Sequence, residues 1–393
     1  MDVLLIHYSE IGTKGANRGF FERRLREDVK KRLVPRDAVS VNVDNVRLVA
    51  PLTENNDKAR IREALQQVFG IAWHAFGKQV ERDEASLKAA CVKAAREAAG
   101  AKTFKVFVKR VDKGYPMSSD ALCRSLGAAV ASDTGLKVDL DDHDLAVHVE
   151  ILADKALVFT EKTEGLRGMP HGSAGRMLCL FSGGIDSPVA AWSMMKRGAL
   201  VDLLHFHPYA TNAEVVGTKI TDLHRALRTF NPRSLLYLIP HHRYQAAAAL
   251  KIPPAYETVV FRRFMLRAAE ALARRRGLKA LVMGDALGQV ASQTLENIAA
   301  ALGGLDLPVF QPLISLDKEE IVRLAQKIGT FDSSNKPYKD CCSLMSRRPK
   351  TRVSVEQCRA LEAELGISDL LPATLADAAA WNGEGLREKI FIS

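Results

Sequence analysis

The amino-acid sequence predicts an α/β fold class, with a C-terminal doubly wound parallel sheet preceded by two smaller α+β domains. Three observations support this prediction. Strand and helix patterns alternate regularly from residue 177 onward. The first 75 residues follow the order β-α-β-β-α-β. A stretch with four glycines and a proline, GLRGMPHGSAG at 165–175, lies between the two patterns and is typical of an interdomain linker, with a catalytic loop as the alternative.

The first predicted domain, residues 1–75, has the element order of a ferredoxin-like domain. Its expected elements are a strand (3–8), a basic amphipathic helix (17–33), a hairpin (39–43 and 47–50), a second helix (57–68) and a last strand (72–76). Asp57 is the expected cap of the second helix, because its carboxylate can accept hydrogen bonds from free backbone N–H groups. The apolar face of the basic helix is expected to consist of Phe20, Phe21, Leu25 and Val29.

The second predicted domain, residues 76–165, is also α+β. Its expected elements are helices at 84–99 and 120–131 and strands at 103–109, 146–151 and 156–160. Residues 103–109 (TFKVFVK) alternate like a half-buried strand, and the inward face would carry Phe104, Val106 and Val108.

The third predicted domain, residues 166–393, contains the doubly wound sheet. Strands are expected at 177–181, 200–205, 234–239 and 279–283, and helices at 188–197, 213–229 and 256–276. A ligand is expected at the carboxyl ends of these strands. Beyond Pro349 the chain is expected to be mostly short helix, ending in a packed helix pair, and residues 361–393 hold six acidic residues against two basic ones.

Composition and charge limit the classes of function. The chain has 393 residues, 47% of them apolar, which is enough for two or three hydrophobic cores. A net charge of +10 favours a polyanionic partner. No apolar run is long enough to span a membrane, and the N-terminus MDVLLIHYSE does not have the pattern of a signal peptide, so we expect a cytoplasmic protein with no membrane partner. The six cysteines form no CxxC pair, so a zinc site is not expected.

Residues 182–187, SGGIDS, stand where a strand meets a helix and carry the main functional signal. Gly183 and Gly184 would let the backbone take positive φ and approach an anion, while Ser182 and Ser187 add hydroxyl donors at a helix N-terminus. No lysine follows the glycines, so the pattern is not a Walker motif. A plain glycine turn is the alternative, but the complete string at this place favours nucleotide binding.

The string resembles the PP-loop of the ATP pyrophosphatase superfamily. This resemblance implies cleavage of ATP between its α and β phosphates and transfer of AMP to an oxygen of the substrate. Asp186 would then be the natural Mg²⁺ ligand. A helix-capping acid is the alternative role for Asp186, and the two roles are compatible.

Further segments narrow the resemblance. SGGIDSPVA, HFH, GDALGQVASQTLEN, PLISLDKEEI and DCCSLMSRRPKT follow in order, after YSEIGTKGANRGFFERRL and FKVFVKRVDKGYPMSS near the N-terminus. Together they resemble the tRNA 4-thiouridine synthetase (tRNA uridine 4-sulfurtransferase, ThiI) family. The resemblance implies that a ferredoxin-like domain and a THUMP domain bind the acceptor end of tRNA and that the PP-loop domain adenylates the uridine at position eight.

The resemblance also assigns site residues. The expected ATP contacts, apart from the SGGIDS loop, are Leu180, Phe181, His205, Phe206, Arg262, Gly284 and Gln293. Asp186 and Lys318 are expected in the active site, with Lys318 contacting phosphate or the activated base. Taken individually, His205 and Phe206 are more typical of core residues. Arg262 is one of seven basic residues among 262–279, which would equally fit a solvated or RNA-facing surface.

The sulfur carrier of the family aligns with Cys342. A persulfide on this residue, loaded by a cysteine desulfurase or another donor, could attack C4 of the adenylated uracil directly or through released sulfide. A cationic setting that would lower the thiol pKa is supplied by Lys339, Arg347, Arg348 and Lys350. Cys91, Cys123 and Cys179 lie in apolar patterns and are expected in the core.

The sequence departs from many family members, whose C-terminal rhodanese domain is not expected in the short stretch after PKT. The resolving thiol would then be Cys341, Cys358, a separate sulfur carrier or an external reductant. An iron–sulfur cluster is a further alternative as a cofactor, although two adjacent cysteines cannot ligate one alone. The sequence does not decide the sulfur donor, a link to thiamine biosynthesis, or whether the chain forms a homodimer.

Two basic clusters support tRNA as the partner. Residues 18–32 contain seven basic and three acidic residues, and a second cluster consists of Lys102, Lys105, Lys109, Arg110 and Lys113. A solvated helix face is the alternative for residues 22–32 taken alone. Two rival functions remain: a PP-loop enzyme that adenylates a small molecule, and a non-catalytic RNA-binding protein with a degenerate nucleotide site.

Overall fold

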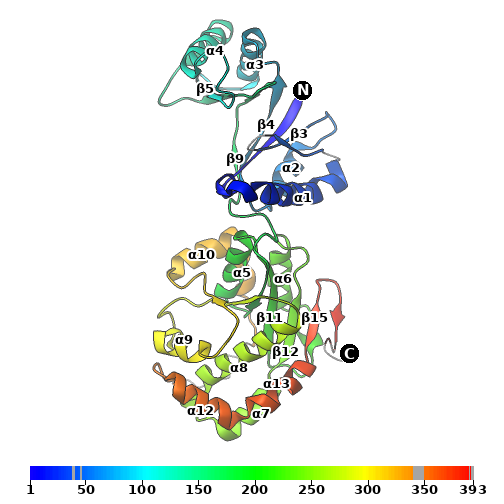
Figure 1. The fold of residues 1–393 in the computed structure, drawn as a ribbon, viewed down its shortest axis with the longest axis vertical. Helices are drawn as coiled ribbons and strands as arrows, with labels where there is room; N and C mark the ends of the chain where they lie inside the picture. Colours follow the sequence, from blue (N-terminus) through cyan, green and yellow to red (C-terminus); the bar gives the residue numbers. More distant parts are fainter. Residues whose placement is uncertain (38–39, 45–46, 340–348, 389, 391–393) are drawn as a thin grey trace. The chain divides into compact units, whose positions relative to one another are not determined.

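The computed structural model describes residues 1–393 except 38–39, 45–46, 340–348, 389 and 391–393. It divides into two compact units, Met1–Pro170 and His171–Ser393. The boundary falls inside the glycine-rich stretch 165–175 (Figure 1). In the described residues, no helix is both long and apolar enough to cross a bilayer.

One sheet runs through the whole first unit in the order β2-β3-β1-β4-β8-β7-β5-β6, and β9 pairs with β4. The strands are β1 (Asp2–Tyr8), β2 (Asn42–Asp44), β3 (Arg47–Pro51), β4 (Ile71–Val80), β5 (Thr103–Arg110), β6 (Lys137–Val138), β7 (Leu145–Ile151), β8 (Ala156–Phe159) and β9 (Thr163–Glu164). The helices are α1 (Arg18–Asp37), α2 (Lys58–Leu65), α3 (Glu84–Glu97) and α4 (Ser119–Thr134). As predicted, the Asp57 carboxylate caps α2 by accepting hydrogen bonds from Ala59 N and Arg60 N.

Strand β4 joins the two predicted N-terminal domains. The sequence predicted a strand over 72–76, but β4 continues to Val80 and pairs with β1 on one side and β8 on the other. Gly77 permits this pairing, because a Cβ atom there would lie 2.6 Å from the carbonyl oxygen of Val158. The polar residues after Phe76 therefore continue the strand where the sequence indicated its end.

Helix α1 differs from the prediction at its beginning. Two short 3₁₀ turns, Glu10–Thr13 and Gly15–Asn17, precede it. Leu25 and Val29 are buried as predicted, but Phe20 is 39% exposed and its ring lies beneath the guanidinium of Arg24. The prediction for Phe20 was wrong because five residues of helix turn this side chain about 140° away from Leu25.

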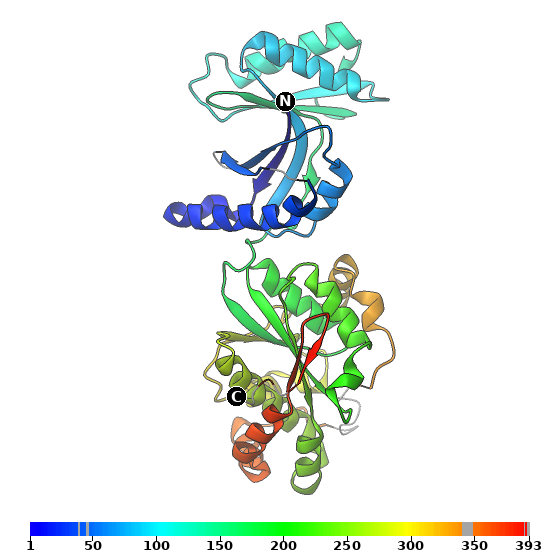
Figure 2. The same ribbon diagram turned by 90° about the vertical axis from the view of Figure 1, so that its right-hand side faces the viewer.

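The second unit contains a sheet in the order β14-β13-β10-β11-β12-β15-β16, with helices on both faces (Figure 2). Its strands are β10 (Arg176–Leu180), β11 (Leu200–His207), β12 (Leu236–Pro240), β13 (Ala280–Val282), β14 (Val309–Phe310), β15 (Ala379–Trp381) and β16 (Leu386–Arg387). Its α-helices are α5 (Asp186–Lys196), α6 (Lys219–Arg228), α7 (His242–Lys251), α8 (Pro254–Arg275), α9 (Leu295–Leu302), α10 (Lys318–Lys327), α11 (Phe331–Ser334), α12 (Val355–Leu365) and α13 (Ile367–Ala376). The pairs among β14, β13, β10, β11 and β12 are all parallel, which confirms the predicted parallel sheet.

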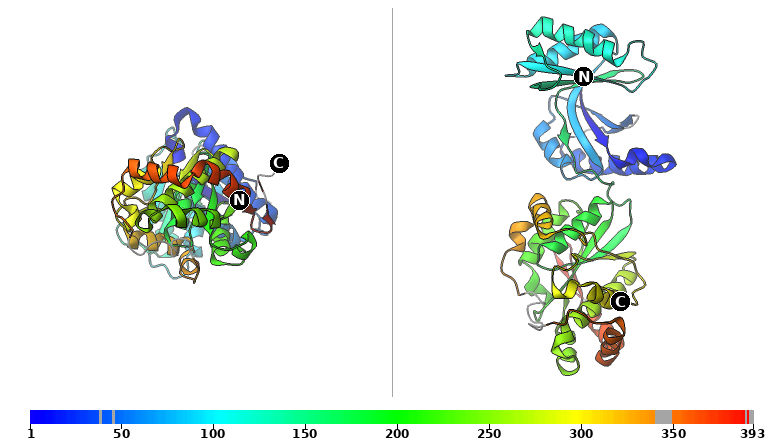
Figure 3. Two further views of the ribbon diagram at one scale, coloured as in Figure 1. Left: turned by 90° about the horizontal axis from the view of Figure 1, so that it is seen from below. Right: turned by 90° about the vertical axis from the view of Figure 1, so that its left-hand side faces the viewer.

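Two segments of the second unit depart from the prediction. The helix expected over 213–229 is split into a 3₁₀ turn, Asn212–Val215, and α6, because Gly217 between them has φ +84°. The C-terminal stretch was expected to end in a helix pair. Helices α12 and α13 do form and pack on α7 and α8 (orange to red in Figure 3), but β15 then adds to the sheet antiparallel to β12.

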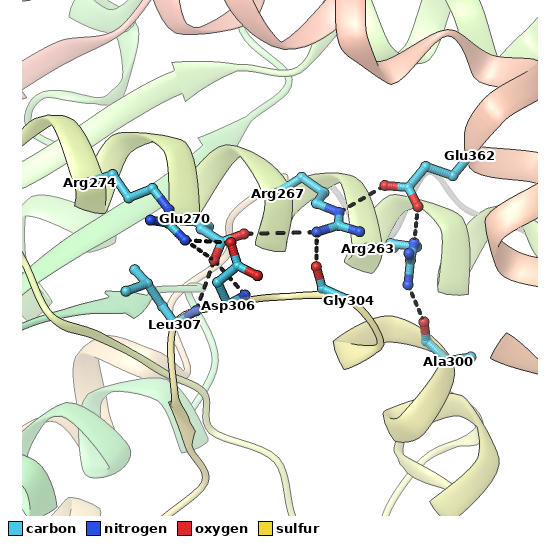
Figure 4. Close-up of polar contacts among 9 residues, drawn as sticks. All are labelled: Arg263, Arg267, Glu270, Arg274, Ala300, Gly304, Asp306, Leu307 and Glu362. Atoms are coloured by element: carbon cyan, nitrogen blue, oxygen red, sulfur yellow. Dashed lines mark hydrogen bonds and ion pairs between the residues drawn. The ribbon is translucent and has the colours of Figure 1, made fainter.

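The basic residues on α8 are tied to the acidic C-terminal stretch. Arg263 is 1% exposed and donates to Glu362 of α12 and to Ala300 O, while Arg267 donates to the other oxygen of Glu362 at 2.9 Å. Further along α8, Glu270 accepts from the backbone N–H groups of the loop after α9, at Asp306 and Leu307 (Figure 4). These arginines therefore hold the unit together, and the sequence-based alternative of an RNA-facing surface does not apply to them.

We predict that Glu362→Ala lowers the free energy of unfolding by about 3 kcal/mol, because it leaves the charge of Arg263 buried without its partner. Urea unfolding followed by circular dichroism measures this change. Glu364→Ala, at an exposed position of the same helix, is the matched control and is expected to change stability by less than about 0.5 kcal/mol. Equal effects of the two variants would contradict the role of Glu362.

Buried histidines make the second unit sensitive to acid. Burial lowers the pKa of His224 to about 4, and its ring nitrogen Nε2 donates to Ser234 O. Because the folded-state pKa lies below the unfolded value, the stabilisation is complete above about pH 6.5 and is lost as the pH falls toward 4. We predict that His224→Gln shows a shallower loss of stability between pH 6.5 and 4.5 than the parent protein, measured by urea unfolding. His242→Gln, at an exposed site, should retain the parent slope.

Candidate active site

The SGGIDS loop connects β10 to α5 and is closed by hydrogen bonds within itself. The hydroxyl of Ser187 accepts from Ser182 N at 2.9 Å and donates to Ser182 O at 3.1 Å. Gly184 N donates to the hydroxyl of Ser182 at 3.3 Å. Neither Gly183 nor Gly184 has positive φ, so the expectation of left-handed backbone at these glycines was wrong. The loop lies at the N-terminus of α5, where free N–H groups favour an anion.

Gly284, which follows strand β13, determines how closely the backbone after β13 approaches the SGGIDS loop. A Cβ atom at residue 284 would lie 2.9 Å from Ser187 N and 3.0 Å from the carbonyl carbon of Asp186. The backbone that leaves β13 therefore touches the first turn of α5, and no side chain fits between them. Because β10 and β13 are parallel neighbours, this contact lies at their carboxyl ends, as expected for a ligand site.

Asp186 and Lys318, which are 132 residues apart in the sequence, form an ion pair. Lys318 Nζ lies 2.8 Å from Asp186 Oδ1, and Gln289 Nε2 donates to Asp186 Oδ2 at 3.2 Å. Lys318 begins α10, whose N-terminus is fixed by a capping box between Asp317 and Glu320. The structure therefore brings together the two residues that the sequence assigned to the active site, and it adds Gln289.

Arg262 lies in a buried polar cluster. It is 8% exposed and pairs with Asp285 at 2.8 Å, so the alternative of a solvated surface position was wrong. Asp285 also accepts from Gln311 at 2.7 Å and from Gln293 at 3.4 Å. The sequence analysis missed Gln311 and gave no individual role to Asp285, although Asp285 belongs to the quoted segment GDALGQVASQTLEN. The signal for Asp285 was its place in Gly284-Asp285, directly after a strand that ends at the ligand edge.

His205 of strand β11 forms hydrogen bonds to two other segments, one of which is the stretch that precedes the cysteine pair. Its Nδ1 donates to Phe181 O at 2.7 Å, and burial lowers its pKa to about 3, so the ring is neutral. Nε2 therefore accepts from the hydroxyl of Tyr338 at 2.9 Å. The ring of Phe206 packs against Phe261 and Phe264 in the core, so only its backbone could contact a ligand. Tyr338 was not singled out from the sequence.

The described cysteines are poor candidates for sulfur chemistry. Cys358 is fully buried in α12, and burial raises the pKa of its thiol to about 11, which contradicts its candidacy as the resolving thiol in this fold. Cys91 and Cys179 are buried as predicted, whereas Cys123 is only half-buried. The candidate sulfur carrier Cys342, its neighbour Cys341 and the bases Arg347 and Arg348 lie outside the described residues.

The described side chains contain no ready metal centre, since no three His, Cys, Asp or Glu residues among them are grouped to hold an ion. Asp186 nevertheless presents a carboxylate beside the loop, and carboxylate oxygen is a ligand that Mg²⁺ prefers. Mg²⁺ bound in the usual way, through one carboxylate and substrate phosphates, is compatible with this arrangement.

Comparison with known proteins gives the same order of parts. Family models match at residues 3–75 (ThiI ferredoxin-like domain), 81–161 (THUMP domain) and 172–367 (thiamine biosynthesis protein, ThiI). The probable tRNA sulfurtransferase of Thermus thermophilus is 39% identical over 398 residues, covering 99% of this chain and 97% of that protein. The probable tRNA sulfurtransferase of Thermoanaerobacter sp. is 38% identical over 365 residues, covering 92% and 94%.

A solved structure matches over the same length. The crystal structure of a 4-thiouridine synthetase–RNA complex with bound ATP superposes with a TM-score of 0.86 at 32% identity, and the match covers 99% of this chain and 100% of that one. The predicted fold class is confirmed by this match and by the three family models. On the evidence of relatives that share more than a third of its residues over nearly its whole length, the chain belongs to the ThiI family of tRNA sulfurtransferases.

Proposed function

We propose that this chain is an ATP-dependent tRNA sulfurtransferase that converts the uridine at tRNA position eight to 4-thiouridine. The observation that carries the proposal is the meeting of three groups at the carboxyl ends of β10 and β13: the SGGIDS loop, the Asp186–Lys318 pair and the Arg262–Asp285 cluster. Such a meeting provides a phosphate cradle, a metal-binding carboxylate and a cation in one place. The membership of the chain in the ThiI family supports the same activity.

In the first step, uracil O4 attacks the α-phosphorus of ATP and pyrophosphate leaves. The N-terminus of α5 and the hydroxyl of exposed Ser182 face the place where the departing pyrophosphate carries its charge. Lys318 is held beside this place by Asp186 and can move to a phosphate oxygen or to the uracil. Bound Mg²⁺ would supply further positive charge to the phosphates, with Asp186 as its ligand.

In the second step, sulfur replaces AMP. The terminal sulfur of a persulfide on Cys342 attacks C4 of the adenylated uracil, AMP leaves with its electron pair, and C4 remains joined to Cys342 through a disulfide. A second thiol then attacks the Cys342 sulfur, forms a disulfide with it and releases 4-thiouridine. Since Cys358 is buried, this thiol is Cys341 or an external one. The persulfide comes from a cysteine desulfurase or another donor in the cytoplasm, and the same persulfide could supply thiamine thiazole synthesis.

The first unit is the proposed tRNA-binding part, with residues 1–75 as a ferredoxin-like domain and 76–165 as a THUMP domain ahead of the PP-loop domain at 166–393. Exposed cations that can track phosphates include Arg23 and Lys31 on α1 and Lys102, Lys109 and Lys113 around β5. Arg110 of the predicted cluster instead donates to the backbone carbonyls of Tyr115 and Met117, so its role is structural.

The test of the function is a reconstituted reaction with tRNA, Mg-ATP, cysteine and a cysteine desulfurase. We expect tRNA-dependent release of pyrophosphate and the near-ultraviolet absorbance of 4-thiouridine. Pyrophosphate release that needs a small metabolite and no tRNA would favour the small-molecule PP-loop enzyme instead. Binding of tRNA without any turnover of ATP would favour the non-catalytic RNA-binding protein.

We predict that Asp186→Ala slows tRNA-dependent pyrophosphate release about 100-fold or more, because it removes the carboxylate that orients Lys318 and that would hold Mg²⁺. The affinity for tRNA, measured by filter binding, should not change. Asp306→Ala is the matched control. Asp306 also pairs with a cation, Arg274, but this pair lies at the C-terminal end of α8 and not at the SGGIDS loop. A normal rate for Asp186→Ala would disprove its assigned role.

We predict that Cys342→Ser retains tRNA-dependent pyrophosphate release and loses formation of 4-thiouridine, because the adenylation groups remain while the sulfur carrier is absent. Cys358→Ser is the matched control and should thiolate at the parent rate, given its burial. Mass spectrometry after loading with the desulfurase should find the extra sulfur on the Cys342 peptide. If Cys342→Ser thiolates normally, the assignment of the sulfur carrier is wrong.

A further inference from the structure

The chain that leads to residues 340–348 is attached to the candidate nucleotide site. The hydroxyl of Ser334 donates to Gly184 O of the SGGIDS loop at 3.3 Å, and buried Lys219 donates to Ser334 O at 3.0 Å. Tyr338 follows, with its hydroxyl bound to His205. Cys342 is four residues beyond Tyr338 in the sequence, and four residues of any chain span at most about 14 Å.

The chain that follows residues 340–348 is held by a different group, the amide side chain of Asn297 on α9. Asn297 Nδ2 donates to Lys350 O at 2.9 Å, and its Oδ1 accepts from Val353 N at 3.0 Å. The neighbouring hydroxyl of Thr294 donates to Thr351 O at 2.7 Å. Asn297 has 0% exposure, so these bonds form away from water and fix the path of residues 350–353.

The second N–H donor of the Asn297 amide binds the turn that carries Gln293, next to the candidate nucleotide site. Asn297 Nδ2 also donates to Ala291 O at 2.8 Å, in the 3₁₀ turn Ala291–Gln293. In that turn, Gln293 Nε2 donates to Asp285, and Asp285 in turn pairs with Arg262. A primary amide has two N–H donors and a carbonyl acceptor, and Asn297 uses all of these groups to join the two segments.

We propose that Asn297 is a positioning residue that couples adenylation to thiolation, because it holds the chain after the Cys342 segment in register with the turn that carries Gln293. This inference rests on the proposed function. An adenylated uracil that is not met by sulfur is attacked by water, which returns uridine and AMP. Misplacement of the sulfur carrier by a small distance therefore lowers the yield of 4-thiouridine for each pyrophosphate released more than it lowers the release itself.

The test measures this yield in the reconstituted reaction with the full chain. Asn297→Asp removes both amide donors and places a carboxylate against the carbonyls of Ala291 and Lys350, while it retains the acceptor for Val353 N. We expect the yield of 4-thiouridine per pyrophosphate to fall about tenfold or more. Asn231→Asp is the matched control: Asn231 is also a buried asparagine of the second unit, but it donates to Val201 O, and its yield should equal that of the parent.

A second pair of variants guards against loss of folding. Thr294→Val removes the bond to Thr351 O together with the α9 cap on Asn297 N, and should lower the yield, whereas Thr294→Ser keeps the hydroxyl and should restore it. A proportional fall of release and thiolation in Asn297→Asp, an equal loss of yield in Asn231→Asp, or a parent yield in Thr294→Val would overturn the role of Asn297. If the parent protein itself forms no 4-thiouridine, the proposed function fails. A thiolating parent with unchanged variants rejects only the coupling role.

Discussion

The contact between Gly284 and the first turn of α5 is the constraint on which the candidate site depends. With any side chain at residue 284, a Cβ atom would meet Ser187 N and the carbonyl carbon of Asp186 at about 3 Å, and β13 would have to move away from β10. Asp285, the next residue, would then lose its place beside Arg262. The single absent Cβ atom thus sets the spacing between the phosphate-facing loop and the polar cluster, and the other site residues are arranged around that spacing.

The charge of the chain is distributed differently from what its net value indicates. Part of the basic surplus is consumed inside the second unit, where Arg263 and Arg267 share Glu362, and Arg243 pairs with Asp377 near the end of α13. The acidic C-terminal stretch therefore neutralises basic helices of its own unit. Exposed cations that could meet a polyanion lie on the first unit, on α1 and around β5, and on the second unit as well, for example at Arg233, Lys251 and Lys279. A binding surface cannot be inferred from a run of basic residues before their internal partners are known.

Local pattern was sufficient for four central strands of the second unit and for the loop. Alternating and continuous apolar runs placed β10, β11, β12 and β13, and the string SGGIDS marked the ligand edge, because these signals depend on neighbours in the sequence. Asp186 and Lys318 came from resemblance, and the structure brings them to 2.8 Å. Tyr338 and Gln311 were missed because their partners are distant in sequence and nothing in their local pattern distinguishes them. Asn297 ends the quoted segment GDALGQVASQTLEN, but its bonds to Lys350 and Val353 join it to a stretch that its own sequence neighbours do not reveal. Strand β15 was missed because its alanines are equally typical of a helix.

Strand β4 determines whether the ferredoxin-like and THUMP domains can be separated. Its first half pairs with β1 and β9, and its second half, from Gly77 to Val80, also carries β8. The matched ferredoxin-like model ends at residue 75 and the THUMP model begins at 81, so the border between two named modules is occupied by the strand that both of them need. Cutting there would leave each half with an open sheet edge ready to pair with another chain. In this protein the two modules share one continuous sheet, and neither has a complete sheet without the other.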